Sequence, residues 1–209
     1  MIEKNYLKLS NPPAGFLDLC IETYEKYKQV PWQIEMSPYH FSTDVDQDDL
    51  EKFRNFLPEM VWTVSLNLIT KAILPLTHID RKRKAALQVP IVSDPDKHFV
   101  YVLAKEDYFD KLESIDEKGE FRSGNKPEVE WLNQRYPGMP MFHKFDKKYF
   151  EVSPVEQFIP YINDTSLPHG GYHFDGGKQQ PVSERWFISV SLPDRMTVSQ
   201  REKVFVDWL

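Results

Sequence analysis

A mainly β domain with helices at its N-terminal end is what this sequence predicts, from two patterns. Beyond residue 61, apolar residues either alternate with polar ones or form short runs, which is typical of strands. Prolines are twice as frequent as glycines, 16 against 8, and they separate short apolar runs. Short strands joined by Pro- and Asp-containing turns indicate an antiparallel sandwich or barrel.

Residues 1–60 are expected to be a helical support for the sheet. Asn11-Pro12-Pro13 is a plausible helix start, and the apolar residues that follow recur at helical spacing until Pro31-Trp32. A second helix is predicted from Asp46 to Phe56, with acidic residues in its first turn. The only cysteine, Cys20, excludes an internal disulfide and is expected to be a small buried hydrophobic residue.

The β core is predicted to span residues 61–192 of a single domain. The expected strands cover residues 62–68, 73–80, 85–92, 99–103, 149–152, 157–162 and 185–192. The charged segment 105–147 interrupts them and is interpreted as an insertion, either a lid over a substrate or a decorative excursion. Residues 193–209 form a C-terminal tail, in which a short helix is expected from residue 197.

Composition narrows the class of protein. The hydrophobic fraction of 41% and the charged fraction of 28% are ordinary for a globular domain. A net charge of −6 makes nucleic acid an unlikely partner. No signal peptide opens the chain and no apolar run reaches membrane-spanning length, so a cytoplasmic location without membrane contact is expected.

The stretch Leu74-Pro75-Leu76-Thr77-His78-Ile79-Asp80 carries the strongest chemical signal. Side chains alternate in a strand, so His78 and Asp80 are expected to share a face. With a second histidine they would complete a 2-His-1-carboxylate triad, which holds Fe(II) and leaves positions for other ligands. A His-x-Asp also occurs by chance in many chains, so the motif needs the remaining parts of the site.

His169 is the candidate second histidine, because it precedes two glycines that let the backbone approach a site closely. Arg185 opens an apolar strand 16 residues later and shares a face with Phe187, Ser189 and Ser191. An arginine flanked by hydroxyl groups can hold a carboxylate through two parallel hydrogen bonds. Taken singly, His169 also fits a structural histidine, and Arg185 also fits a surface residue at a strand start.

The order of these motifs resembles the Fe(II)/2-oxoglutarate-dependent dioxygenases. His-x-Asp, a strand ending in Pro-Ile, Asn-x-x-x-x-Pro-His-Gly and an Arg-led apolar strand follow one another, and they are most similar to the aspartyl/asparaginyl β-hydroxylase-like branch. The resemblance covers about residues 61–192. It implies a double-stranded β-helix, a jelly-roll or cupin-like barrel of two facing sheets with iron at one mouth.

The resemblance also implies the roles of particular residues. His78, Asp80 and His169 would be the catalytic metal ligands, and Arg185, beside Ser189, would bind the distal carboxylate of 2-oxoglutarate. Arg83 matches a basic position just after His-x-Asp and would touch the cosubstrate or the substrate. The implied activity is that of a hydroxylase, which decarboxylates 2-oxoglutarate to succinate and oxidises a small-molecule or peptide substrate.

Two departures from the family pattern keep alternatives open. The gap from His169 to Arg185 is longer than expected, and His173, only 12 residues before Arg185, is a rival ligand. If His169 is the ligand, residues 174–183 form an inserted loop. The rival functions are a cupin-like metal enzyme that does not use 2-oxoglutarate and a non-catalytic β-sandwich binding protein in which the histidines are incidental.

Overall fold

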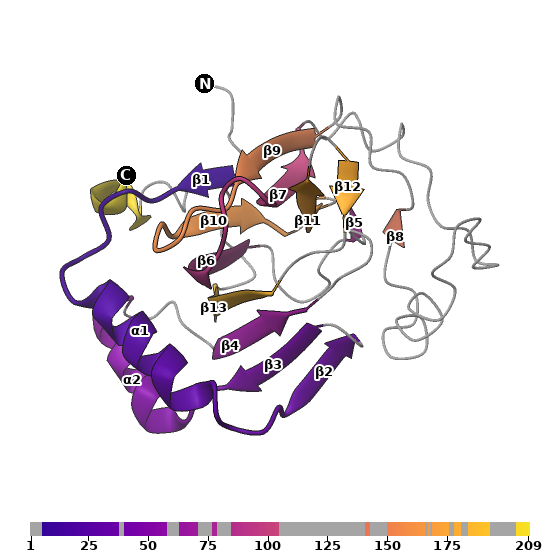
Figure 1. Ribbon diagram of the computed structural model, residues 1–209. Helices are drawn as coiled ribbons and strands as arrows, with labels where there is room; N and C mark the ends of the chain where they lie inside the picture. The colour runs from indigo at the N-terminus through magenta and orange to yellow at the C-terminus, as the bar shows by residue number, and fades with distance from the viewer. Residues whose placement is uncertain are drawn as a thin grey trace.

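Two antiparallel sheets form the body of the protein (Figure 1). The computed structural model describes residues 6–37, 40–57, 63–70, 77–78, 85–104, 141–142, 150–165, 167, 169–175, 178–180, 184–192 and 204–209, with the backbone alone at 34–37, 77–78, 141–142, 172–175 and 178–180. The predicted Asp80 and Arg83 lie outside the described residues, as does the segment 105–147 except for two residues.

Within the described ranges the larger sheet has seven strands, and every pair of neighbours is antiparallel. In spatial order they are β1 (Tyr6–Lys8), β10 (Tyr161–Asp164), β6 (Ala85–Val92), β13 (Arg185–Ser191), β4 (Val64–Ile69), β3 (His40–Asp44) and β2 (Ile34–Ser37).

The described residues of the smaller sheet form six strands. Its order is β8 (Met141–Phe142), β5 (Thr77–His78), β11 (His169–Asp175), β7 (His98–Leu103) and β9 (Phe150–Pro154), and β12 (Lys178–Gln180) pairs with β11.

The chain crosses repeatedly from one sheet to the other. β4, β6, β10 and β13 belong to the larger sheet, and the strands that alternate with them along the chain, β5, β7, β9 and β11, belong to the smaller one. Side chains from the two sheets meet in the interior, where Val100 of β7 packs with Tyr161 of β10. This arrangement is a double-stranded β-helix, and the predicted fold class is confirmed.

Two helices cover the outer face of the larger sheet (Figure 1). They are α1 (Phe16–Tyr27) and α2 (Gln47–Phe56). Their apolar sides pack on outward residues such as Leu66, Leu87 and Ile188. Cys20 is fully buried in this layer, as predicted. None of the helices among the described residues is long and apolar enough to cross a membrane.

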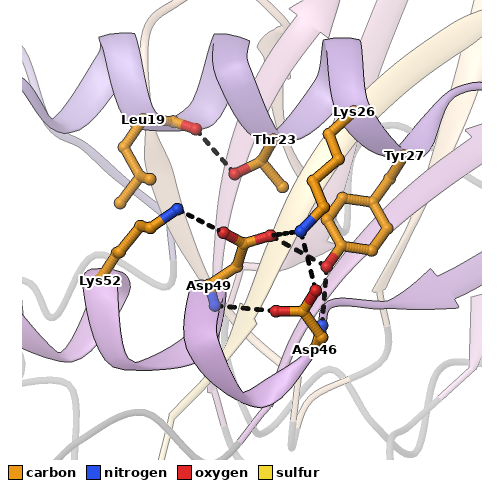
Figure 2. Close-up of polar contacts among 7 residues, drawn as sticks. All are labelled: Leu19, Thr23, Lys26, Tyr27, Asp46, Asp49 and Lys52. Carbon is orange, nitrogen blue, oxygen red and sulfur yellow. Dashed lines mark hydrogen bonds and ion pairs between the residues drawn. The ribbon is translucent and has the colours of Figure 1, made fainter.

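A buried carboxylate joins the two helices (Figure 2). Asp49 of α2 accepts hydrogen bonds from Tyr27 Oη at 2.9 Å, Lys26 Nζ at 2.7 Å and Lys52 Nζ at 2.7 Å. The carboxylate of Asp46 caps α2 by accepting from the Asp49 backbone N–H at 2.9 Å, which satisfies one of the donors that a helix start leaves unpaired. The cluster ties the helical layer together and lies away from the sheet interior.

Several elements differ from the sequence prediction. The N-terminal region contains strands β1, β2 and β3 besides its helices, and the sequence did not predict them. The strand expected over 157–162 begins only at Tyr161, because Phe158 adopts a left-handed backbone conformation (φ 61°) in a turn. Residues 174–183 were expected to form a loop, but the described part is a hairpin in which β12 pairs with the end of β11. The short helix expected from residue 197 falls mostly outside the described residues, which begin again at Val204 and include a 3₁₀ helix at Val206–Trp208.

Candidate functional site

The site starts from two histidines that the sheet register brings together. In the pairing of β5 with β11, His78 stands directly opposite His169. Opposite positions of an antiparallel pair belong to one face of the sheet, with Cβ atoms about 4.5–5.5 Å apart. Histidines 91 positions apart in the sequence therefore occupy adjacent places in the smaller sheet. Asp80, two residues after His78, lies outside the described residues.

His169 is held in one orientation. Its side chain is buried, and Nδ1 lies 2.9 Å from the carbonyl oxygen of Leu167. A carbonyl can only accept, so Nδ1 carries the proton and donates it, which puts the lone pair of the neutral ring on Nε2. Metal-binding histidines are commonly oriented by such a bond from the other ring nitrogen to a backbone carbonyl.

The rival His173 occupies a different place. It lies four residues further along β11, opposite His98 of β7 and Gln180 of β12. Four residues of strand span about 13 Å. His78 therefore has His169, and not His173, as its cross-strand neighbour.

The two glycines after His169 face opposite sides of the smaller sheet, and each has a reason to lack a side chain. A Cβ on Gly170 would lie 2.3 Å from the hydroxyl of buried Tyr101. A Cβ on Gly171, which shares the face of His169, would lie 3.2 Å from Nη1 of Arg185. Arg185 thus crosses the interior from the larger sheet and meets β11 two residues, or about 7 Å, from His169.

Arg185 is a buried cation held by neutral groups. It is 4% exposed. Its Nη2 donates to Tyr161 Oη at 2.6 Å and to Gln88 Oε1 at 3.2 Å, and its guanidinium lies 4.8 Å from the ring centre of Phe187. Among the described residues no carboxylate forms an ion pair with it, and its buried Nε has no hydrogen-bond partner. Fully buried arginines are almost always paired, so this environment favours an anionic ligand.

Tyr161 and Gln88 hold the guanidinium of Arg185 in place. The Tyr161 hydroxyl donates to Gln88 Oε1 while it accepts from Arg185. Burial raises the pKa of Tyr161 although the charge of Arg185 lowers it, so the hydroxyl keeps its proton. The ring of Tyr6 stacks on that of Tyr161 at 5.1 Å between centres. Neither Tyr161 nor Gln88 was predicted as a site residue, because in the sequence each is only one position of an expected strand.

Ser189 belongs to the same polar row on the inner face of the larger sheet. It is buried, and it stands opposite Ser65 of β4 on one side and Gln88 of β6 on the other. Gln88 in turn stands opposite Tyr161. The alternation of side chains along β6 could have identified Gln88 as an inward-facing residue, because Gln88 does not lie on the face that carries the outer apolar core.

The described residues contain part of the predicted site. The structure brings His78 beside His169, and Arg185 close to β11 and beside the row of Ser189. No group of three or more His, Cys, Asp or Glu residues that could hold a metal ion occurs within the described ranges, from which Asp80 and Arg83 are missing.

The fold is similar to that of known enzymes. No protein-family model matches the sequence, and a search of curated proteins finds no match. HygX from Streptomyces hygroscopicus with nickel and 2-oxoglutarate bound has a TM-score of 0.50 and 10% identity, over 93% of this chain and 85% of HygX. HygX with hygromycin B bound as well gives a TM-score of 0.51, with the same identity and coverage.

A second similar protein is SnoN, described as a non-heme alpha-ketoglutarate-dependent epimerase from nogalamycin biosynthesis. Its TM-score is 0.50 at 10% identity, over 91% of this chain and 77% of SnoN. At these identities the likeness concerns the fold, and the function has to be argued from the site.

Proposed function

We propose that this protein is an Fe(II)/2-oxoglutarate-dependent oxygenase, with His78, Asp80 and His169 as metal ligands and Arg185 as the anchor of the cosubstrate. The observation that carries the proposal is the environment of Arg185. A buried guanidinium with an unpaired Nε and only neutral partners among the described residues favours an anionic ligand, and it meets β11 about 7 Å from His169. We expect a short dicarboxylate to span the space between the guanidinium and the metal ligands.

The proposed ligands are of the types that bind Fe(II). Two imidazoles and one carboxylate on a β-barrel are the ligands of non-heme Fe(II) oxygenases. The register supports His169 as the partner of His78, and Nε2 of His169 carries the lone pair that a metal needs. Bound together, Fe(II) and 2-oxoglutarate would supply dioxygen activation coupled to decarboxylation of the cosubstrate to succinate.

The chain's own residues supply orientation and exclusion of water. Leu167 fixes the ring of His169, while Tyr161 and Gln88 fix Arg185. The buried side chains of Val100 and Phe187 line the interior nearby and lower its polarity. A charge-assisted bond to a carboxylate gains strength in such surroundings.

Hydroxylation of a small molecule is the proposed outcome. HygX, with its bound hygromycin B, supports the substrate class, whereas SnoN is an epimerase on the same fold, so product analysis has to identify the reaction. The assignment to the aspartyl/asparaginyl β-hydroxylase-like branch, and the role of Arg83, rest on the sequence resemblance alone.

The test is an anaerobic titration of 2-oxoglutarate into the Fe(II) protein, followed by the metal-to-ligand absorption band. His169→Ala is expected to lose the metal. Arg185→Ala should keep it and bind 2-oxoglutarate about 30-fold to several thousand-fold more weakly, the effect of breaking a buried charged pair of about 2–5 kcal/mol. Arg185→Lys should recover only part, because lysine lacks the planar fork. Equal titration of wild type and Arg185→Ala would favour a metal enzyme that does not use 2-oxoglutarate.

A further inference from the structure

Two buried side-chain atoms in the described part of the chain have no hydrogen-bond partner. One is Nε of Arg185, which the proposed cosubstrate would satisfy, and the other is Oδ1 of Asn163. Native proteins leave few buried polar atoms unpaired, and each exception calls for an explanation. Asn163 is neither a proposed metal ligand nor a partner of Arg185.

Asn163 lies between Tyr161 and His169 along the chain, near the end of strand β10. It is 4% exposed and follows Tyr161 by two residues on the same face of β10, a separation of about 7 Å. Tyr161 holds the guanidinium of Arg185. In the other direction, the chain passes from Asn163 to His169 in six residues as it crosses to the facing sheet.

The surroundings of Asn163 differ from those of a structural asparagine on the same face. Its cross-strand neighbour on β6 is Ala86, which offers only a methyl group. Asn67, also 4% exposed, is satisfied within the protein. The amide Nδ2 of Asn67 donates to the carbonyl oxygen and to Oγ of Ser65 at 3.1 and 3.0 Å, and its Oδ1 lies 3.3 Å from Nε2 of His40.

We propose that Asn163 is a cosubstrate-binding residue, whose amide contacts the 2-oxo-acid end of the dicarboxylate that Arg185 holds by its distal carboxylate. The inference rests on the proposed function and adds a residue to it. Rotation of an amide by 180° exchanges Oδ1 and Nδ2. A 2-oxo dicarboxylate has only acceptor oxygens, so Asn163 turns its Nδ2–H toward the ligand.

The experiment compares Asn163→Leu with the matched control Asn67→Leu. Thermal unfolding of the ligand-free protein is measured first. Removing an amide whose oxygen is unpaired should leave the melting temperature unchanged or raise it by about 2–4 °C, whereas removing the satisfied amide of Asn67 should lower it by a similar amount or more. A lower melting temperature for Asn163→Leu, matching that of Asn67→Leu, would overturn the inference.

Calorimetric titrations of the Mn(II)-loaded protein with 2-oxoglutarate and with glutarate, which lacks the 2-oxo group, give the second readout. Asn163→Leu should bind 2-oxoglutarate about 10- to 100-fold more weakly, the worth of a hydrogen bond to a charged group. It should lose less of its affinity for glutarate, because without the 2-oxo group that end of the ligand cannot chelate the metal and is not held against the amide. Asn67→Leu should preserve the ratio of the two affinities. If leucine prevents folding at position 163, Asn163→Ala must show the same fall in that ratio.

The outcomes separate the inference from its premise. An unchanged ratio in the Asn163 variants, with weaker binding in Arg185→Ala, overturns the role of Asn163 and leaves the proposed function standing. No binding of 2-oxoglutarate by the wild-type protein overturns both.

Discussion

Replacing Gln88 by glutamate is expected to remove most of the affinity for 2-oxoglutarate while the fold is kept. Gln88 Oε1 lies 3.2 Å from Nη2 of Arg185, so the substitution places a carboxylate beside the guanidinium. Opposite charges about 4 Å apart attract by about 4 kcal/mol at an effective dielectric constant near 20. The cosubstrate would have to compete with this internal ion pair, and its own carboxylate would be repelled. If only about 2 kcal/mol of this attraction opposes binding of the cosubstrate, its affinity falls at least about 30-fold.

The assay is calorimetric titration of the Mn(II)-loaded protein with 2-oxoglutarate, and Gln88→Met is the control. Methionine has a similar length and no charge, and Tyr161 still holds Nη2 in that variant. Methionine removes the hydrogen bonds that Gln88 accepts from Arg185 and Tyr161, but it leaves the charge of Arg185 free for the ligand, so binding should weaken about fivefold at most. Because the new glutamate pairs with a buried cation, Gln88→Glu should not unfold more easily than Gln88→Met. If the two variants bind 2-oxoglutarate equally, the charge of Arg185 is not what the ligand recognises.

Three further predictions concern the ligand set, the glycines and the helical layer. His173→Ala should retain stoichiometric Fe(II), measured by metal analysis, whereas His169→Ala should not. Gly171→Ala should weaken 2-oxoglutarate binding with little change in melting temperature, and Gly170→Ala should lower the melting temperature through overpacking of about 1–3 kcal/mol. Asp49→Asn should lower the free energy of unfolding by about 1.5–3 kcal/mol at pH 7. The two proteins should converge in urea titrations as the pH falls below about 4, and persistence of the full difference there would contradict this.

The pH window follows from the environment of Asp49. Burial acts to raise the pKa of this carboxyl group, but hydrogen bonds from Lys26, Lys52 and Tyr27 outweigh burial and lower the pKa below its ordinary value. A group whose pKa is lower in the folded state stabilises the protein above its unfolded-state pKa. The stabilisation is lost as the pH falls through the folded-state value, because the carboxylate is then protonated.

The strands of the core could be predicted because their patterns are local. Residues 85–92 are apolar except for Gln88, and they became β6 (Ala85–Val92). The alternation in β13 placed Ile188 on the outer face and Arg185 on the inner one, as the sequence predicted. Each of these patterns reports burial of one side chain after another along a single strand, which needs no knowledge of distant partners.

The features that the sequence did not predict depend on partners that are distant in the chain. β1 and β3 are strands because they pair with β10 and β4, and neither has a periodic apolar pattern that would predict a strand by itself. Gln88 and Tyr161 acquire their role only when β13 brings Arg185 beside them. The pairing of His78 with His169 was inferable as a motif, but the register of β5 on β11, which places His169 and not His173 opposite His78, was not.

The two faces of the larger sheet differ in composition, and this difference explains how the barrel can hold so many polar groups in its interior. The outer face and the two helices form the largest apolar cluster, which includes Phe53, Leu87 and Ile188. Among the side chains that the structure describes, the apolar clusters of the smaller sheet and the interior contain fewer residues. Burying an arginine and an unpaired amide is unfavourable for folding, and a large apolar layer elsewhere offsets it. The stability of the fold therefore depends less on apolar contacts of the inner face, and polar residues can occupy positions there.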